Sequence, residues 1–296
     1  MTPEPRGLSR RAAFAGGTLL AAAAVAILVG ERRRPLRPSG QAEPGRTVRN
    51  LLLGAMSMAV VASVENPIVR RLSARVERSR WGLVQRLPLS AGARDALAVL
   101  LMDYTIYLWH VGTHRIPFLW RFHLVHHLDL DMDSSTALRF HAADMALSTP
   151  YRAAQVLLIG VSPRALEIWQ RWFFASVLFH HSNLRLPPRL ERALALVLTT
   201  PEMHGIHHSA ERDRTDSNWS SGLSVWDRLH GTFRLDAVPA PEIGVPAYRD
   251  PTDIALGAAV ALPFVRQRDA WTPVANGPAM PAARSVGEII LEDARS

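Results

Sequence analysis

Long apolar runs separated by arginine-rich connectors constrain the fold of this chain more than any other feature. The longest run, residues 12–30, has no charged residue and is about as long as a helix must be to cross a bilayer core of roughly 30 Å. Further apolar runs occupy residues 51–64, 96–109, 145–161 and 165–179. The pattern predicts an all-α integral membrane protein with about four or five membrane-spanning or membrane-embedded helices.

The positions of the basic residues favour a membrane partner. The chain has 34 basic residues, all of them arginine, against 26 acidic residues, for a net charge of +8. The arginines lie beside the apolar runs instead of along one helix face, so we expect contact with anionic lipid headgroups and none with nucleic acid. In residues 68–86 arginines separate the apolar side chains, which predicts a helix lying in the headgroup plane.

Loop charges indicate the orientation. The predicted connector, residues 31–50, carries six arginines, whereas three precede the first run. Basic loops stay in the cytoplasm, so we expect the connector there, the N-terminus outside, and residue 110 onward in the cytoplasm of a bacterial plasma membrane. The seven arginines of residues 66–94 would then lie outside, against the same rule. Ser9-Arg10-Arg11 before an alanine-rich run leaves open an alternative, a twin-arginine export leader.

Eleven of the 12 histidines lie between Trp109 and His208. They are His110 and His114, then His123, His126 and His127, then His141 alone, then His180 and His181, and finally His204, His207 and His208. Residues three and four apart share a helix face, so we expect each closely spaced set to point in one direction. Residues 145–179 are predicted to form a helical hairpin, which returns the chain and leaves every set on one side of the membrane.

The number of these histidines favours more than one metal ion. The chain has no cysteine, which excludes disulfides, cysteine-ligated zinc and iron–sulfur clusters. A zinc site takes about four ligands, so one zinc would leave most of the imidazoles without a partner. Two metal ions would use them. Imidazole binds zinc, copper, iron and nickel, so ligand type leaves the metal open.

The histidines and their flanks resemble the fatty acid hydroxylase superfamily, the sterol desaturase branch of membrane di-iron enzymes. The matching segments are Asp103-Tyr104 through His114-Arg115, Leu119 through His127, Leu138 through His141, His181-Ser182-Asn183 through Pro187, Thr200-Pro201 through Ser209, and Leu223 through Thr232. The resemblance is close over residues 100–236 and loose over Glu31 through Arg37. It divides the chain into N-terminal membrane helices (1–95), a catalytic domain (96–236) and a soluble or interfacial tail (237–296).

The resemblance implies a membrane oxygenase with a cytoplasmic histidine-rich helical cap that holds two non-haem iron ions. Such an enzyme hydroxylates or desaturates a sterol-like, isoprenoid or fatty acyl lipid that enters from the bilayer, using O₂ and electrons from a separate reductase. The ligands that it implies are His110, His114, His123, His126, His127, His181, His204, His207 and His208.

Four more residues are candidates for a further ligand or for a group that orients one. They are His141, His180, Asn183 and Asp227. The chain also departs from the family at Asn218-Trp219-Ser220 and at His230. Because neither departure falls within a histidine set, we expect both to leave the metal site untouched.

Two other functions fit the residues. A zinc-dependent membrane hydrolase would attack an ester or amide with a metal-bound water and would need neither O₂ nor a reductase. A non-catalytic histidine-rich metal-binding membrane protein is the third candidate.

Overall fold

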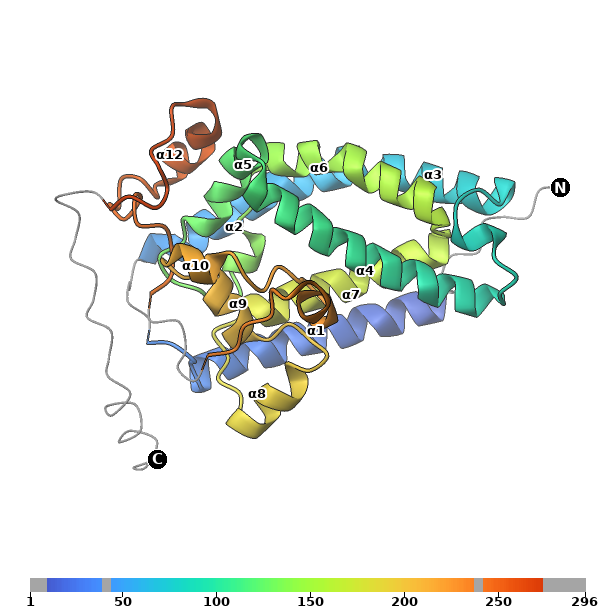
Figure 1. Ribbon diagram of the computed structural model, residues 1–296, viewed down its shortest axis with the longest axis horizontal. Coiled ribbons are helices and arrows are strands. Elements are labelled where there is room, and N and C mark those ends of the chain that lie inside the picture. Colours follow the sequence, from blue (N-terminus) through green and yellow to red (C-terminus); the bar gives the residue numbers. More distant parts are fainter. Residues whose placement is uncertain (1–9, 39–43, 237–241, 274–296) are drawn as a thin grey trace.

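The computed structural model describes residues 10–38, 44–236 and 242–273, and these residues form a helical bundle with a cap at one end (Figure 1). The elements are α1 (Arg10–Arg33), α2 (Pro44–Val60), η1 (Val61–Glu65), α3 (Asn66–Ser79), η2 (Val84–Arg86), α4 (Ala91–Arg115), α5 (Pro117–His127), η3 (Thr136–Leu138), α6 (Ala142–Gln155), η4 (Val156–Gly160), α7 (Pro163–His181), α8 (Pro188–Leu194), α9 (Pro201–His207), α10 (Arg212–Thr215), α11 (Val225–His230), α12 (Leu256–Ala261) and η5 (Leu262–Phe264). These residues contain isolated bridges but no β-strand, so the all-α prediction is confirmed. Ser9 of the export-leader motif and residues 274–296 of the predicted tail lie outside the described residues.

Three helical stretches of the described chain are long and apolar enough to cross a membrane. They are Phe14–Arg33, Gly45–Arg86 and Ala91–Arg115. The other two predicted spans form α6 with η4, and α7, which do not meet that standard within the described residues. Both nevertheless pack in the same bundle, α6 against α2 and α7 against α1 and α4 (Figure 1). The described residues therefore contain three candidate spans, with α6 and α7 packed beside them.

The hairpin of α6 and α7 brings the histidine sets to one end of the bundle. α4 ends at Arg115, α6 runs away from that end, and α7 runs back to finish at His181 (Figure 1). Ser162 begins the return, because its hydroxyl accepts a hydrogen bond from the backbone N–H of Ala165 and caps α7. The predicted return of the chain is therefore seen in the structure.

Residues 44–79 form one helical stretch, which corrects two predictions. α2 begins at Pro44, inside the predicted connector, because Arg46 and Asn50 on its first two turns are buried against the loop after α5. The π-helical η1 then joins α2 directly to α3. The helix predicted over residues 68–86 is therefore not separate: it continues a candidate span and ends at Ser79.

Two glycines close the end of the bundle opposite the histidines. Gly82 and Gly160 have φ angles of +94° and +88° and lie against each other, where the α3–α4 and α6–η4–α7 connections meet. A Cβ atom on Gly160 would lie 2.8 Å from the carbonyl oxygen of Trp81. Gln85 adds a hydrogen bond from Nε2 to the Gly160 carbonyl oxygen at 2.8 Å. Only glycine combines this close approach with positive φ at no steric cost.

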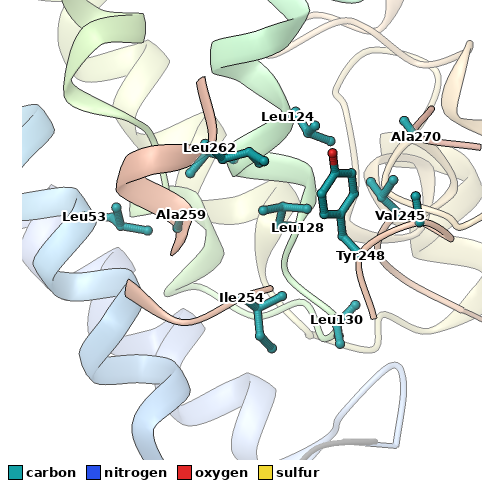
Figure 2. Close-up of a cluster of buried hydrophobic side chains, with 12 residues drawn as sticks. Leu53, Leu124, Leu128, Leu130, Val245, Tyr248, Ile254, Ala259, Leu262 and Ala270 are labelled. Atoms are coloured by element: carbon teal, nitrogen blue, oxygen red, sulfur yellow. The ribbon is translucent and has the colours of Figure 1, made fainter. Parts of the chain in front are cut away.

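Residues 242–273, the described part of the predicted tail, pack onto the cap. Figure 2 shows Tyr248 and Leu262 of this segment beside Leu124 and Leu128 of α5 and the loop that follows it. The whole cluster comprises Leu53, Leu124, Val125, Leu128, Leu130, Val245, Ala247, Tyr248, Ile254, Ala259, Leu262 and Ala270. Burial of this apolar surface holds α5, which carries three of the histidines, against η5 and the rest of the C-terminal segment.

Candidate metal centre

Two groups of histidines form in the described part of the chain where α4, α5, α7 and α9 meet. The five-histidine group is His110, His114, His123, His127 and His207, and the four-histidine group is His126, His181, His204 and His208. Within each group the donor nitrogens lie within 4.8 Å of one another. The groups touch, since the rings of His127 and His208 stack with centroids 4.3 Å apart. The structure thus gathers all nine histidines that the sequence predicts as ligands.

Each closely spaced triplet is divided between the two groups, which differs from the prediction that it points in one direction. His123 and His127 join the five-histidine group, whereas His126 between them joins the other. On α9 the assignment is reversed: His204 and His208 belong to the four-histidine group and His207 to the other. The first and third members of each triplet are four residues apart and share a face, while the middle one turns to the neighbouring group.

Backbone carbonyls orient two rings of the five-histidine group. His110 Nδ1 lies 2.7 Å from the Trp219 carbonyl oxygen, and His207 Nδ1 lies 2.8 Å from that of Ser217. A carbonyl only accepts, so Nδ1 carries the proton in both rings and Nε2 keeps its lone pair. The buried Nε2 atoms of all five rings have no hydrogen-bond partner among the described residues. Five unpartnered ring nitrogens close together, at least two of them with free lone pairs, suit a metal ion.

The nitrogens of the four-histidine group lie too close together for ordinary hydrogen bonding. His181 Nε2 is 3.0 Å from Nε2 of His126 and 3.0 Å from Nε2 of His204. His181 Nδ1 and His126 Nδ1 face the carbonyl oxygens of Val177 and Arg139, so these rings are protonated at Nδ1. Their Nε2 lone pairs therefore face each other, which is unfavourable unless a cation lies between them. The residues present fit a metal ion here as well.

Burial favours the neutral form of the His127, His207 and His208 imidazoles. Burial and neighbouring imidazoles hold the pKa of His127 and His208 well below the ordinary value, and burial lowers the pKa of His207 to about 3. Neutral imidazole is the form that binds a metal. His123 also has a carboxylate behind it, since its Nδ1 lies 3.5 Å from Asp144 Oδ2, both side chains being buried. Such a carboxylate can orient a ligand ring.

His180 and His141, the two further candidate histidines, have different surroundings. The His180 ring is buried with its centroid 4.0 Å from that of His204, and Nδ1 has no partner among the described residues. It lies beside the four-histidine group but outside it. His141 caps α6, because its Nδ1 accepts from Ala143 N and its Nε2 lies 3.2 Å from the Val260 carbonyl oxygen. Both ring nitrogens of His141 are therefore occupied by backbone groups.

Asn183 and Asp227 bind backbone groups instead of imidazoles. The Asn183 amide pairs with the backbone of Arg37, accepting at 2.8 Å and donating at 2.9 Å, and so ties the segment after α1 to the end of α7. Asp227 accepts from the backbone N–H groups of Trp219 and Ser220 at 2.9 and 3.1 Å. Both side chains therefore make backbone hydrogen bonds in the described part of the chain, and a direct effect on a ligand ring stays a prediction. Asp227 holds the backbone of Trp219 and Ser220 in place, and the Trp219 carbonyl oxygen in turn faces His110.

Trp219 also corrects the expectation that residues 218–220 stay clear of the histidines. Its carbonyl oxygen accepts from His110, and its ring centroid lies 6.4 Å from that of His114. Asn218, with a φ of +52°, makes the turn that permits this, and its amide donates to the Met203 carbonyl on α9 at 2.9 Å. The departure from the family pattern therefore lies against the metal centre. His230, by contrast, is exposed and pairs with Tyr104 at 3.1 Å.

A buried ionic network that the sequence analysis missed holds the loop after α5. Arg46 binds Asp129 with two nitrogens, at 2.7 and 2.9 Å, and Asp133 with a third at 2.6 Å. Burial alone would raise the pKa of Asp129, but the charges of Arg46 and Arg139 outweigh it and hold that pKa below the ordinary value. Asn50 bridges Asp129 and Arg139. Asp129 follows His127 by two residues, so this network fixes the end of the second histidine set.

A cavity of about 390 Å³ extends from the histidines into the bundle. Histidines of both groups border it, namely His110, His123, His126, His181 and His204. Its walls are largely apolar and include Met58, Val61, Ile106, Trp109, Met145, Phe173, Phe174 and Val177. An apolar ligand in the cavity would therefore contact both groups at once.

Comparisons with known proteins cover the same part of the chain. Residues 96–232 match the fatty acid hydroxylase family. Human alkylglycerol monooxygenase is 30% identical over 144 residues, which is 47% of this chain and 30% of that protein. Ornithine lipid hydroxylase OlsE of Rhizobium tropici is 28% identical over 174 residues, 58% of this chain and 48% of that protein. Human cholesterol 25-hydroxylase is 24% identical over 160 residues, 48% of this chain and 52% of that protein.

The chain thus spans between about a third and about half of the length of these curated relatives. No solved structure matches it. The matched segment contains every histidine of both groups and the α6–α7 hairpin that brings them together. Residues 96–232 are therefore the part of the chain that is similar to the fatty acid hydroxylase family and to these relatives.

Proposed function

We propose that this chain is a membrane-bound non-haem di-iron oxygenase that hydroxylates or desaturates a lipid. The observation that carries the proposal is the pair of touching histidine groups, with five and four donor nitrogens, at the end of an apolar cavity. When bound, two irons would supply activation of O₂ for oxidation of an unactivated C–H bond. The nine histidines would hold them, His110, His114, His123, His127 and His207 one iron and the remaining four the other.

The protein's own groups position these ligands and keep the site dry. Trp219, Ser217, Val177 and Arg139 supply the backbone carbonyls that fix the proton on Nδ1 of four imidazoles, and so direct Nε2 inward. The apolar cavity wall excludes water from the place where a C–H bond would meet the metals. A substrate with a long apolar part fits this wall.

The names of the relatives support a lipid as the substrate. They are an alkylglycerol monooxygenase, an ornithine lipid hydroxylase and a cholesterol 25-hydroxylase. We propose a lipid substrate for the present chain as well. We further propose that a separate reductase supplies the electrons and that the histidine cap lies in the cytoplasm. The zinc hydrolase is disfavoured because five or four imidazoles per group exceed the three protein ligands of a catalytic zinc ion.

Metal analysis tests the proposal. Protein purified from iron-replete cells should contain about two irons per chain, one for each group, as the ligand counts require. His207→Gln and His208→Gln each remove one ligand, from different groups, and should each lower the iron content. His230→Gln, at an exposed histidine outside both groups, is the matched control and should leave iron unchanged.

Lipids from cells with and without the gene give the second measurement. A species that gains one oxygen atom, or loses two hydrogen atoms, only when the gene is present supports the oxygenase. One zinc per chain together with ester or amide cleavage in the absence of O₂ would overturn it.

A further inference from the structure

A buried ion pair borders the cavity far from the histidines. Glu65 and Arg152 are 8% and 7% exposed and both line the cavity, with Glu65 Oε1 and Arg152 Nε 3.8 Å apart. Glu65 lies midway along the candidate span Gly45–Arg86, at the end of the π-helical η1. Ionisable groups inside a membrane are costly and are most often functional, and π-helical turns are frequent at functional sites.

Helix geometry places this pair at the opposite end of the cavity from the metal centre. On α6, Asp144 faces His123, and Arg152 follows eight residues later, roughly 12 Å along the helix axis. On α7, Gln170 precedes His180 by ten residues, roughly 15 Å. Both residues line the same cavity as the histidines. The cavity therefore has a metal end, an apolar middle and a second polar end.

The second polar end contains a donor without a partner beside a carboxylate, whose Oε2 accepts from the Ser148 hydroxyl at 3.5 Å. Arg152 Nε is buried and has no hydrogen-bond partner within the described ranges, and 3.8 Å is too long for a hydrogen bond to Glu65. The Arg152 guanidinium is held in place by Gln155, at 2.6 Å, and by the Trp169 ring, 4.3 Å from its carbon. A hydroxyl group between the pair would accept from Arg152 Nε and donate to Glu65 Oε1.

The charges select the class of ligand. The charges of the Glu65 carboxylate and the Arg152 guanidinium cancel each other. An anionic ligand would be repelled by Glu65 and a cationic ligand by Arg152, with no further charge to compensate. The neighbouring polar groups that line this end are neutral: Ser148, Asn66 and Gln170, with Gln170 donating to Asn66 at 3.0 Å. An uncharged group that both donates and accepts is the best match.

We propose that Glu65, Asn66, Ser148, Arg152 and Gln170 form a subsite that binds an uncharged hydroxyl group of a lipid, at the end of the cavity opposite the histidines. That this lipid is the substrate rests on the proposed function. The subsite would place a C–H bond that is roughly 12 to 15 Å from the hydroxyl at the metal centre.

Equilibrium binding tests the subsite without turnover. The purified full chain in phosphatidylcholine nanodiscs is titrated with labelled hexadecanol, and unlabelled hexadecanol, hexadecane, hexadecanoate and hexadecylamine compete for it. The concentration of each probe is measured in the nanodisc and expressed per lipid. Differences in partitioning between water and membrane then do not enter the comparison. We expect hexadecanol to bind about tenfold more tightly than hexadecane, the worth of one buried hydrogen bond, and more tightly than either charged probe.

A double variant, Glu65→Leu with Arg152→Met, removes the pair without leaving one charge unpaired. It should lose the preference for hexadecanol and keep its affinity for hexadecane. The matched control is Arg268→Met with Asp253→Leu, an ion pair outside the cavity, which should keep the preference.

The proposal is overturned if wild-type protein binds hexadecane or a charged probe as tightly as hexadecanol, or if the double variant retains the preference. The wild-type ranking decides the matter even where the double variant does not fold. Because the assay needs neither O₂ nor a reductase, a protein that shows the preference but contains no iron would overturn the proposed oxygenase and leave the subsite standing.

Discussion

Replacement of Arg46 by methionine should destabilise the cap more than any surface substitution. The Arg46 guanidinium binds Asp129 and Asp133 and also donates to the Asp131 carbonyl oxygen and the Thr136 hydroxyl. Without it, the Asp129 carboxylate, 1% exposed, would retain hydrogen bonds from Asn50 and Thr136 but no facing guanidinium at 2.7 Å. Breaking a buried pair by removing one partner costs about 3–5 kcal/mol.

A double-mutant cycle measures how much of that cost belongs to the pair. Asp129→Asn keeps the shape of the side chain and removes its charge, so the double variant Arg46→Met/Asp129→Asn lacks the unpaired carboxylate. Its loss should be smaller than the sum of the single losses by at least about 2 kcal/mol. Arg268→Met, which breaks an ion pair with a partly exposed arginine, is the control and should cost less than about 1 kcal/mol.

The assay is reversible unfolding of the purified protein in mixed micelles with increasing dodecyl sulfate, followed by tryptophan fluorescence. The loop held by Arg46 follows the second histidine set directly, so Arg46→Met should also release metal at a lower chelator concentration than wild type. A loss below about 1 kcal/mol for Arg46→Met, or strictly additive losses in the cycle, would refute the reasoning.

Three further predictions concern the metal centre and the closed end of the bundle. Asp144→Asn removes the carboxylate 3.5 Å from His123 Nδ1 and should weaken metal binding by about 10- to 100-fold in a chelator competition; unchanged affinity would show that the contact does not orient the ring. Gly160→Ala places a Cβ atom against Trp81 at positive φ and should lower the free energy of unfolding by about 1–3 kcal/mol. The control is Gly257→Ala, whose Cβ atom would meet nothing within 4 Å. It should not lower the free energy of unfolding in the same dodecyl sulfate titration. Chelation of the metals should lower the thermal midpoint of the wild-type chain, since buried imidazole nitrogens would lose their partners; an unchanged midpoint would count against metal in both groups.

Much of the metal centre was predictable because its pattern is local. Three-residue and four-residue spacings indicate which imidazoles lie on helix faces, and the family resemblance then implied which nine of them are ligands. Apolar runs likewise located α1, α4 and the α6–α7 hairpin. Asn183 and Asp227 were recognised as candidate polar residues, but the sequence left open whether their partners are imidazoles or backbone groups. Asn183 binds the backbone of Arg37 and Asp227 binds the backbone of Trp219. These partners are brought close only when the chain folds.

The residues that orient the ligands were harder to find. Backbone carbonyls such as those of Trp219 and Ser217 have no signature in side-chain identity, because every residue has one. Asp144 offered a weak signal, an acidic residue at the start of a helix near His141. Arg46 and Asp129 are 83 residues apart, and no local spacing relates them.

Helix periodicity and hydropathy are properties of neighbouring residues, and they account for the all-α membrane class, the histidine-bearing helices and the number of imidazoles available. Contacts between distant segments decide the rest. The packing of α5 beside α9 divides the two triplets between the groups. His126 of α5 joins His204 and His208, and His207 of α9 joins His123 and His127. The packing of the bundle also brings together Glu65 and Arg152, which are 87 residues apart in the sequence. They lie at one end of the cavity, and the histidines border its other end. A helix dictates which of its side chains share a face, but the partner of that face depends on how the bundle packs.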